Sequence, residues 1–472
     1  MRPEGLTYVC SSAAKQVKRD KGLDSAAGHA AIQSLLDAER GRSPNSRKAE
    51  GLLDPAVATA FDQHVRRADT GYLSRWADIV SSEPLAQSDA ELVARLVGGY
   101  LLDAGFAPDH LHRWLKFCTK EQRSLPEILE DADRMVGEPA RDYEVWVLFQ
   151  RIPSQVRAQA GDRFKTHHSF LEMLTERGLP QPTAREGAGV LRFDVTAREP
   201  RAALVEADLA VRRLRSRTVV GDPGERADGP GLALVANASR PTWHNLPPQG
   251  KVFLPSLRQH SGLFPSGPSV GRFEDALELL ASVETSTTGA SLASIWAALE
   301  GLLARPGAEA LPNVADRAAD LVTCSLPVAE LHMLRDQGGE GTTYDSLADL
   351  FSAICDGSWE ASSIRHHAAA LRVISMRDDP LVLGRVRSYF RDAFRRLYNQ
   401  RNFVMHGGRM DSIALPAAMR TMPSLVGASV DRIVHALSLD EPTDPLNLAA
   451  RAANELDLYG SPGSRPLASL LS

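Results

Sequence analysis

The chain has 472 residues, which is enough for two or three domains with separate hydrophobic cores. Hydrophobic residues make up 43% of it and charged residues 24%, as is typical of a water-soluble globular protein. The net charge of −5 excludes a uniformly basic coat for nucleic acid, so any affinity for RNA must come from a local basic patch.

The cysteines are scattered at Cys10, Cys118, Cys324 and Cys355, without a C-x-x-C pair. Zinc sites and disulfide frameworks need clustered or paired cysteines, so this spacing predicts neither and favours a reducing cytoplasm. The N-terminus has no apolar run after its basic residue, and no apolar stretch approaches the ~20 residues of a membrane helix. We therefore expect a cytoplasmic protein with no metal, no cofactor and no membrane contact.

The opening segment, to about residue 53, is polar, with a basic cluster at 15–21 and a turn-rich stretch at 40–48. A solvated surface with a loop is the favoured interpretation, and a nucleic-acid-binding arm is the alternative. Helical spacing dominates from 54 to 135, with one helix at 89–102 and another beginning near Pro108. His110 and His112 stand two apart on that second helix and face different directions, so they do not predict a metal pair.

The hydrophobic period changes after residue 142. The stretch 143–149 is β-branched and aromatic, and 190–196 alternates as a half-buried strand does. A helix at 202–214 and a strand at 231–236 follow, and this order predicts a small α/β or α+β module. Its loop contains Gly221, Gly224, Gly229 and Gly231. No helix follows these glycines, so we interpret them as turn residues and not as a phosphate-cradling loop.

Six prolines between 241 and 268 exclude a long helix there and predict a domain boundary. The helices expected after it are 272–283, 291–303, 314–324, 344–354, 366–377, 381–405 and 416–438. This pattern predicts an all-helical bundle, followed by a loosely packed tail with a short helix at 446–456.

The sequence thus predicts a multidomain, predominantly α-helical α+β protein. The expected parts are an N-terminal helical region (1–140), a small α/β or α+β module (141–240), a proline- and glycine-rich linker (241–270), a helical domain (271–440) and a tail (441–472).

Seven arginines crowd the segment 385–409, which covers most of the helix at 381–405 and the residues just after it, and Asp392 is the only acid in this segment. They are Arg385, Arg387, Arg391, Arg395, Arg396, Arg401 and Arg409. Neutralising phosphates is the main sequence-independent source of affinity for nucleic acid. We therefore interpret this row as an RNA-facing ridge in which Arg395, Arg396 and Arg409 bind the substrate. A solvated or partner-paired helix face is the alternative.

The same helix ends in Arg401-Asn402, with His406 five residues after the arginine and Gly407-Gly408 next. A helix turns about 100° per residue, so Arg401 and His406 lie roughly 140° apart if the chain is helical throughout. The glycine pair can release the chain after His406, and a loosened last turn would aim both side chains into one pocket.

The pattern Arg-Asn-x-x-x-His at a helix end resembles the signature of HEPN ribonucleases. Two upstream stretches, 291–303 with Trp296 and Glu300 and 314–321 with Arg317, resemble the first helices of the Apea-like branch of HEPN domains. The resemblance covers roughly 271–438. It implies a helical bundle that cleaves RNA without a metal ion, in a regulated toxin or anti-phage effector.

By this resemblance, His406 is the general base or acid, Arg401 holds the scissile phosphate, and Asn402 orients the histidine or a phosphate oxygen. RNA supplies its own nucleophile, the 2′-hydroxyl, so a histidine and an arginine suit the chemistry. One histidine does not easily perform both proton transfers. In the family, dimerisation brings two such motifs together in one cleft, so the resemblance implies a homodimer. An activator or antitoxin is a further expected partner.

Glu300 lies one turn after Trp296 on the inward face of its helix, where an unpaired carboxylate is costly. We expect it to pair with Arg317 or Arg401 and to orient that arginine. An arginine and a histidine near a helix end are also common as structural caps. A non-catalytic HEPN-like module that dimerises, or that binds RNA or protein, therefore stays open as the alternative function.

Overall fold

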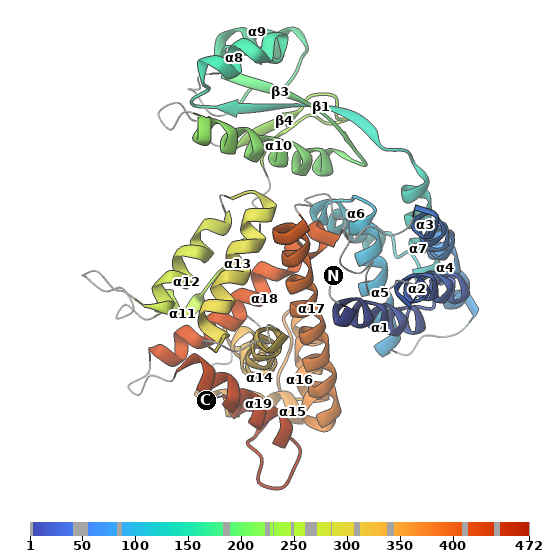
Figure 1. Cartoon of the computed structure of the whole chain (residues 1–472), viewed down its shortest axis with the longest axis vertical. Helices are drawn as coiled ribbons and strands as arrows, with labels where there is room; N and C mark the ends of the chain where they lie inside the picture. The colour runs from blue at the N-terminus through green and yellow to red at the C-terminus, as the bar shows by residue number, and fades with distance from the viewer. Residues whose placement is uncertain are drawn as a thin grey trace. The chain divides into compact units, whose positions relative to one another are not determined.

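The computed structural model describes residues 3–40, 55–82, 87–182, 189–221, 227–229, 231–246, 250–259, 271–284, 286–305, 312–337, 344–407, 414–438 and 444–471. The chain divides into two compact units, an N-terminal unit (Met1–Pro247) and a C-terminal unit (Pro248–Ser472). The described residues are mostly helical and form one five-stranded sheet (Figure 1). The prediction of a predominantly helical α+β protein is confirmed, and the division into five parts stays a prediction.

Helices open the N-terminal unit. They are α1 (Pro3–Arg19), α2 (Ser25–Arg40), α3 (Pro55–Asp69), α4 (Tyr72–Ser82), α5 (Gln87–Asp103), α6 (Pro108–Lys120) and α7 (Leu125–Gly137). Their common core joins Leu73 and Trp76 of α4 to Leu101 of α5 and Leu129 of α7, each at most 2% exposed. The predicted helix at 89–102 is α5, and the helix predicted to begin near Pro108 is α6.

The opening segment is more ordered than its composition predicts, because most of residues 3–40 form α1 and α2. Asp20, between these helices, is 5% exposed. Its carboxylate accepts hydrogen bonds from Tyr72 Oη (3.0 Å) and Trp76 Nε1 (3.1 Å) of α4. The amide of Gly22 donates to the same carboxylate at 3.1 Å. This polar contact joins the first helices to α4, and hydrophobic spacing does not reveal it. Most of the turn-rich stretch, 41–48, lies outside the described residues.

The sheet occupies the second half of the N-terminal unit. Its strands are β1 (Arg141–Phe149), β2 (Phe164–Lys165), β3 (Gly189–Ala197), β4 (Leu232–Val235) and β5 (Trp243–Asn245), in the antiparallel order β2-β3-β1-β4-β5. The helices between them are α8 (Ser154–Ala160), α9 (His167–Glu176) and α10 (Pro200–Gly221). The α/β or α+β module predicted from the sequence is therefore present, and the short elements β2, β5, α8 and α9 were not predicted.

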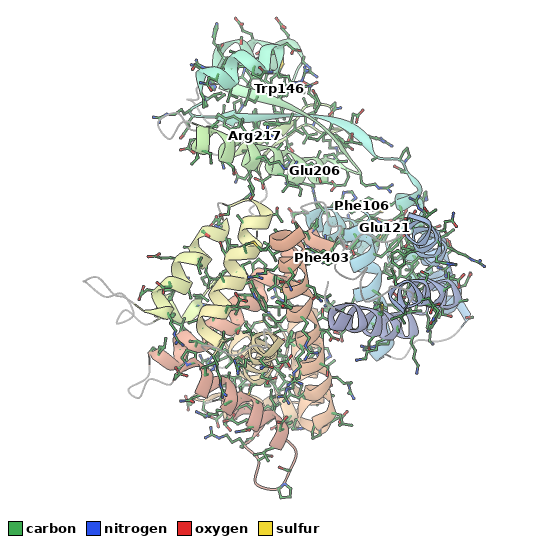
Figure 2. The ribbon with its side chains drawn as sticks, in the orientation of Figure 1. Phe106, Glu121, Trp146, Glu206, Arg217 and Phe403 are labelled. Atoms are coloured by element: carbon green, nitrogen blue, oxygen red, sulfur yellow. The ribbon has the colours of Figure 1, made fainter. Side chains whose placement is uncertain are left out.

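Helices cover both faces of this sheet (Figure 1). On one face, α10 packs on Val145 and Val147 of β1. On the other, Trp146 of β1 (labelled in Figure 2) lies against Phe170 of α9, and their ring centroids are 5.2 Å apart. Burial on both faces explains why the end of β1 is a continuous apolar run without alternation.

Two of the glycines interpreted as turn residues, Gly229 and Gly231, lie in the loop after α10. Gly231 has a φ of +67°, which favours glycine. A Cβ atom on Gly229 would lie 2.7 Å from the Cα of Phe149, so the chain passes β1 too closely for a side chain. Gly224 lies outside the described residues, and Gly221 ends α10.

Two adjacent residues after β3 connect the sheet to the helices before it. Arg198 Nη1 donates to the carbonyl of Val136 at 2.7 Å, and its Nε donates to that of Ala104 at 3.3 Å. Glu199, 4% exposed, accepts a hydrogen bond from the amide of Ala107 at 3.1 Å. Carbonyls near helix C-termini and an amide at a helix start thereby find partners that the helices themselves cannot provide.

The described residues of the C-terminal unit form helices and connecting loops, without a strand, around one hydrophobic core. Its helices are α11 (Pro255–Gln259), α12 (Arg272–Ala281), α13 (Thr288–Leu303), α14 (Pro312–Gln337), α15 (Leu347–Asp356), α16 (Ile364–Asp378), α17 (Pro380–Gly407), α18 (Ala414–Leu437) and α19 (Pro445–Leu458). Helix α14 packs against every helix from α13 to α19 (Figure 1). The helices predicted from the sequence are all present, and α14 continues past its expected end at 324, through Pro327.

The tail corrects a second expectation, because it does not pack loosely. Leu467, Leu470 and Leu471 are each at most 3% exposed and belong to the core of the C-terminal unit. The backbone of Leu471 is held at both groups: its amide donates to Glu455 Oε2 at 2.7 Å, and its carbonyl accepts from Arg432. The residues after α19 have no helical period, yet three buried leucines and two hydrogen bonds hold them against the core.

We predict that Asp20→Ala destabilises the N-terminal unit by about 2–4 kcal/mol, because three buried donors lose their acceptor. Chemical denaturation followed by tryptophan fluorescence measures this. Asp78→Ala is the matched control, since Asp78 is exposed on the same helix as Trp76. Equal midpoints for the two variants would contradict the role of Asp20.

Leu470→Ala is expected to lower the free energy of unfolding of the C-terminal unit by about 2–4 kcal/mol, since it leaves a cavity in the core. Leu458, at 58% exposed, provides the control. Leu458→Ala is expected to change stability by less than about 0.5 kcal/mol. Thermal denaturation of both variants tests whether the tail is anchored. If Leu470→Ala leaves the free energy of unfolding unchanged, the tail packs loosely.

Candidate functional site

The motif residues lie on the second half of α17, where this helix packs beside α13. Trp296 of α13 is fully buried, and its ring centroid lies 5.2 Å from that of Tyr398 on α17. Trp296 Nε1 donates a hydrogen bond to Glu300 Oε1 at 2.6 Å. Residues four apart share a helix face, so the Trp296-Glu300 spacing is what lets the indole hold the carboxylate.

Arg401 lies next to this carboxylate. Its Nη2 is 3.9 Å from Glu300 Oε2, and its Nη1 donates to Asn402 Oδ1 at 3.1 Å. The side chains of Arg401 and Glu300 are 21% and 23% exposed, so the pair lies at the surface edge of the core. We call Glu300, Arg401, Asn402 and the helical position of His406 the candidate site.

The expectation that Glu300 pairs with Arg317 or Arg401 is met by Arg401. Arg317 instead donates from Nη1 to the carbonyl of Leu303, near the end of α13. Burial, and to a smaller extent the charge of Arg305, lower the pKa of the Arg317 guanidinium. Arg317 therefore supports the end of α13 and does not orient Arg401 through Glu300.

Helix α17 continues to Gly407, so His406 lies within the helix. The loosened last turn expected from Gly407-Gly408 is not present, and Gly408 lies outside the described residues. Arg401 and His406 are consequently about 140° apart around the helix axis. Asn402, four residues before His406, shares its helix face. The side chain of His406 lies outside what the structure describes.

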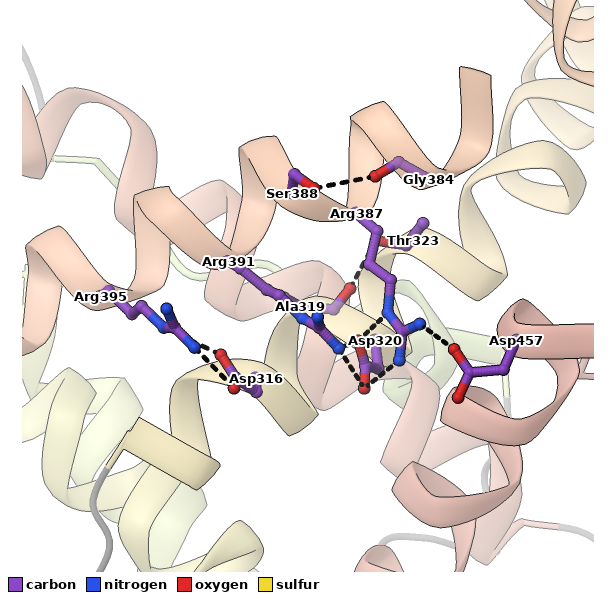
Figure 3. A network of polar contacts seen from close by, with 10 residues as sticks. All are labelled: Asp316, Ala319, Asp320, Thr323, Gly384, Arg387, Ser388, Arg391, Arg395 and Asp457. Carbon is purple, nitrogen blue, oxygen red and sulfur yellow. Dashed lines mark hydrogen bonds and ion pairs between the residues drawn. The ribbon is translucent and has the colours of Figure 1, made fainter. Parts of the chain in front are cut away.

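The row of arginines on α17 is largely paired with acids of the same unit (Figure 3). Arg387 donates to both oxygens of Asp320 on α14, at 2.7 and 3.0 Å, and also to Asp457 on α19. Arg391 donates to Asp320 at 3.1 Å. We call these contacts, together with the next pair on the same two helices, the arginine ladder.

That next pair is Arg395, whose Nε and Nη2 donate to the two oxygens of Asp316 at 3.0 and 2.8 Å. The ladder corrects the interpretation of a continuous RNA-facing ridge, because these guanidinium groups are directed at carboxylates of α14. Hydrogen bonding to Asp320 is the main cause that raises the pKa of Arg387. The alternative of a partner-paired helix face therefore holds for Arg387, Arg391 and Arg395.

The other arginines of the row do not belong to the ladder. Arg385 pairs with Asp379 at 3.1 Å and is largely exposed. Arg396 is exposed, and no carboxylate among the residues with described side chains forms an ion pair with it. Arg409 lies outside the described residues. Of the predicted substrate-binding residues, Arg396 is thus the one with an exposed position in this structure.

Sequence reasoning missed the acids that complete the ladder. Asp316 and Asp320 stand four apart on α14, and Arg387, Arg391 and Arg395 repeat the same spacing on α17. Two helices with opposite charges at one period are a signal for pairing. That signal was present in the sequence, although it does not say which helices are neighbours.

No group of three or more His, Cys, Asp or Glu residues in the described part of the chain is arranged to hold a metal ion. None of the described helices is both long and apolar enough to cross a membrane. Comparison with protein-family models, with curated proteins and with solved structures finds no match. The resemblance to HEPN nucleases therefore depends on the motif and its neighbouring helices alone.

We predict that Asp320→Asn destabilises the C-terminal unit by about 2–4 kcal/mol, because the 6% exposed carboxylate balances two partly buried guanidinium groups. Asp378→Asn is the control, since Asp378 is more than half exposed and pairs with its neighbour Arg377. Denaturation with urea measures both variants. A loss no larger than that of the control would mean that the ladder does not stabilise the unit.

Proposed function

We propose that this protein is a metal-independent endoribonuclease of HEPN type and that the candidate site cleaves RNA. The observation that supports this most is the contact of Arg401 with both Glu300 and Asn402, five residues before His406 on the same helix. Arginine, amide and carboxylate converge there at a partly exposed surface. A purely structural helix end needs only one of them.

The chemistry requires one proton transfer from the 2′-hydroxyl and one to the leaving oxygen. The 2′-oxygen attacks the adjacent phosphorus, the bond from phosphorus to the 5′-oxygen breaks, and a 2′,3′-cyclic phosphate and a 5′-hydroxyl result. His406 is the proposed general base or acid, because imidazole titrates near neutral pH. Arg401 stabilises the charge that develops on the phosphate through its planar set of donors.

Glu300 is proposed to position Arg401. A separation of 3.9 Å is longer than a hydrogen bond, so Glu300 attracts the guanidinium without a close bidentate contact. Trp296 in turn holds Glu300 by a hydrogen bond of 2.6 Å from a fully buried ring. Asn402 accepts from Arg401 and shares the helix face of His406, so it links the two functional positions.

The angular separation of Arg401 and His406 supports a homodimer. Positions about 140° apart on one helix do not easily act on one phosphate. Two α17 ends brought together would supply a histidine from each copy, one as base and one as acid. We propose such a dimer in a cytoplasmic, regulated toxin or anti-phage effector, with the N-terminal unit as the place where an activator or antitoxin binds.

A non-catalytic interaction module is the second candidate, and an exposed stripe on α17 favours it. Leu381, Tyr389 and Phe403 are 71%, 48% and 38% exposed (Phe403 is labelled in Figure 2). Helical geometry places them within about 80° of one another around the axis. Because Arg387, Arg391 and Arg395 are already paired with acids, α17 as a whole is less basic than the sequence indicates. A partner protein would then cover the stripe.

The direct test is cleavage of a mixed RNA pool by the purified protein in EDTA. Wild type is expected to leave 2′,3′-cyclic phosphates, or their hydrolysis products, and 5′-hydroxyls. His406→Ala and Arg401→Ala are each expected to lower the rate at least about 100-fold, the usual contribution of such groups. Arg335→Ala, a change of the same charge far along α14, is the control.

Circular dichroism shows whether the variants fold. Full activity in His406→Ala would remove this residue from the mechanism. If wild type binds RNA and leaves it intact, the interaction module becomes the better description of the C-terminal unit.

A further inference from the structure

A pair of arginines lies one turn beyond the candidate site, where α13 ends and α14 begins. Arg317, in the second turn of α14, donates to the carbonyl of Leu303. Arg305 follows Leu303 by two residues and is exposed. The hydrogen bond therefore brings the guanidinium of Arg317 to the segment that carries Arg305. We call these two residues the arginine pair.

The arginine pair differs from the ladder in its surroundings. Arg387, Arg391, Arg395 and Arg401 each have a carboxylate within ion-pair distance. Among the residues whose side chains are described, no carboxylate forms an ion pair with Arg305 or Arg317. Among the described residues, the acceptor that Arg317 contacts is the neutral carbonyl of Leu303. Two neighbouring guanidinium groups that have no ion-pair partner among the described side chains are a favourable place for an anion.

The arginine pair is close to the candidate site. Leu303, which holds Arg317, is three residues after Glu300 on α13, about 4.5 Å along the helix axis. Glu300 in turn lies 3.9 Å from Arg401. Arg401 and Arg317 thus contact α13 at positions that are three residues apart.

We propose that Arg305 and Arg317 form an anion-binding subsite that takes a backbone phosphate of RNA next to the phosphate held by Arg401. This inference rests on the proposed function of the candidate site. The subsite positions the strand and has no part in proton transfer. Charge neutralisation is independent of base sequence, so the subsite adds affinity without sequence preference.

Binding of a 2′-O-methyl oligoribonucleotide tests the subsite separately from cleavage, because this oligomer has no free 2′-hydroxyl to attack the phosphate. Arg305→Gln and Arg317→Gln are each expected to weaken binding about fivefold at low salt. Each is also expected to reduce the slope of log affinity against log salt by about 0.7, the value of one phosphate contact on a single strand. Arg305→Lys keeps the charge and is expected to retain most of the affinity.

Arg335→Gln is the matched control, since it removes one positive charge from the same helix 18 residues, or about 27 Å, away from Arg317. Arg305 is exposed, so Arg305→Gln tests the subsite even if Arg317→Gln loosens the end of α13. Binding that is unchanged in both variants overturns the proposal. The proposal is also overturned if Arg335→Gln loses as much affinity as the two subsite variants, or if wild type does not bind the oligomer.

Cleavage of the unmodified oligomer by the same proteins separates the two proposals. Weakened binding in the variants with no cleavage by wild type would support the subsite and contradict the nuclease. Cleavage by wild type with unaltered binding in both variants would support the nuclease and contradict the subsite.

Discussion

The carboxylate of Asp320, which is 6% exposed, lies between the guanidinium groups of Arg387 and Arg391 and sets the register of α14 against α17 (Figure 3). A buried carboxylate must be paired, and two arginines one turn apart satisfy both of its oxygens. A shift by one turn would leave either Asp320 or an arginine without its partner. The ladder thus allows one alignment of these helices.

This alignment determines which side chains the rest of α17 contacts. One turn after Arg391, Arg395 reaches Asp316, and the next residues along the helix bring Tyr398 against Trp296. Arg401 then lies beside Glu300, whose carboxylate is held by the same tryptophan. The candidate site is therefore the last contact in a row of contacts along α17. Its geometry depends on charges up to four turns away.

The ladder also changes the electrostatic argument for function. The sequence shows arginines crowded in an otherwise acidic chain, and the structure directs three of them at acids of their own unit. Among the described residues, further basic positions come from different elements: Arg396 on α17, Arg317 on α14 and Arg305 after α13. A nucleic-acid surface built from these would be local and discontinuous. This is the kind of patch that a net charge of −5 permits.

Local spacing determined which segments are helices and strands, because the periods of 3.6 and 2 residues are properties of neighbours in the chain. The helix expected at 381–405 is Pro380–Gly407, and the strand expected at 190–196 is Gly189–Ala197. The sequence pattern likewise grouped the motif residues Trp296, Glu300 and Arg401 before their contacts were known. Two helices of the opening segment were missed, since their anchor is the contact of Asp20 with residues more than fifty positions later.

Only the tertiary structure decided what the charged residues face. An arginine every fourth residue looks the same in a sequence whether it faces water, a phosphate or an acid on another helix. Asp320 and Arg387 are 67 residues apart, and no local pattern links them. The choice of Arg401 over Arg317 as the partner of Glu300 has the same origin, because it follows from how α13, α14 and α17 pack. Secondary structure is set by neighbours in the chain, whereas ion pairs are set by neighbours in space.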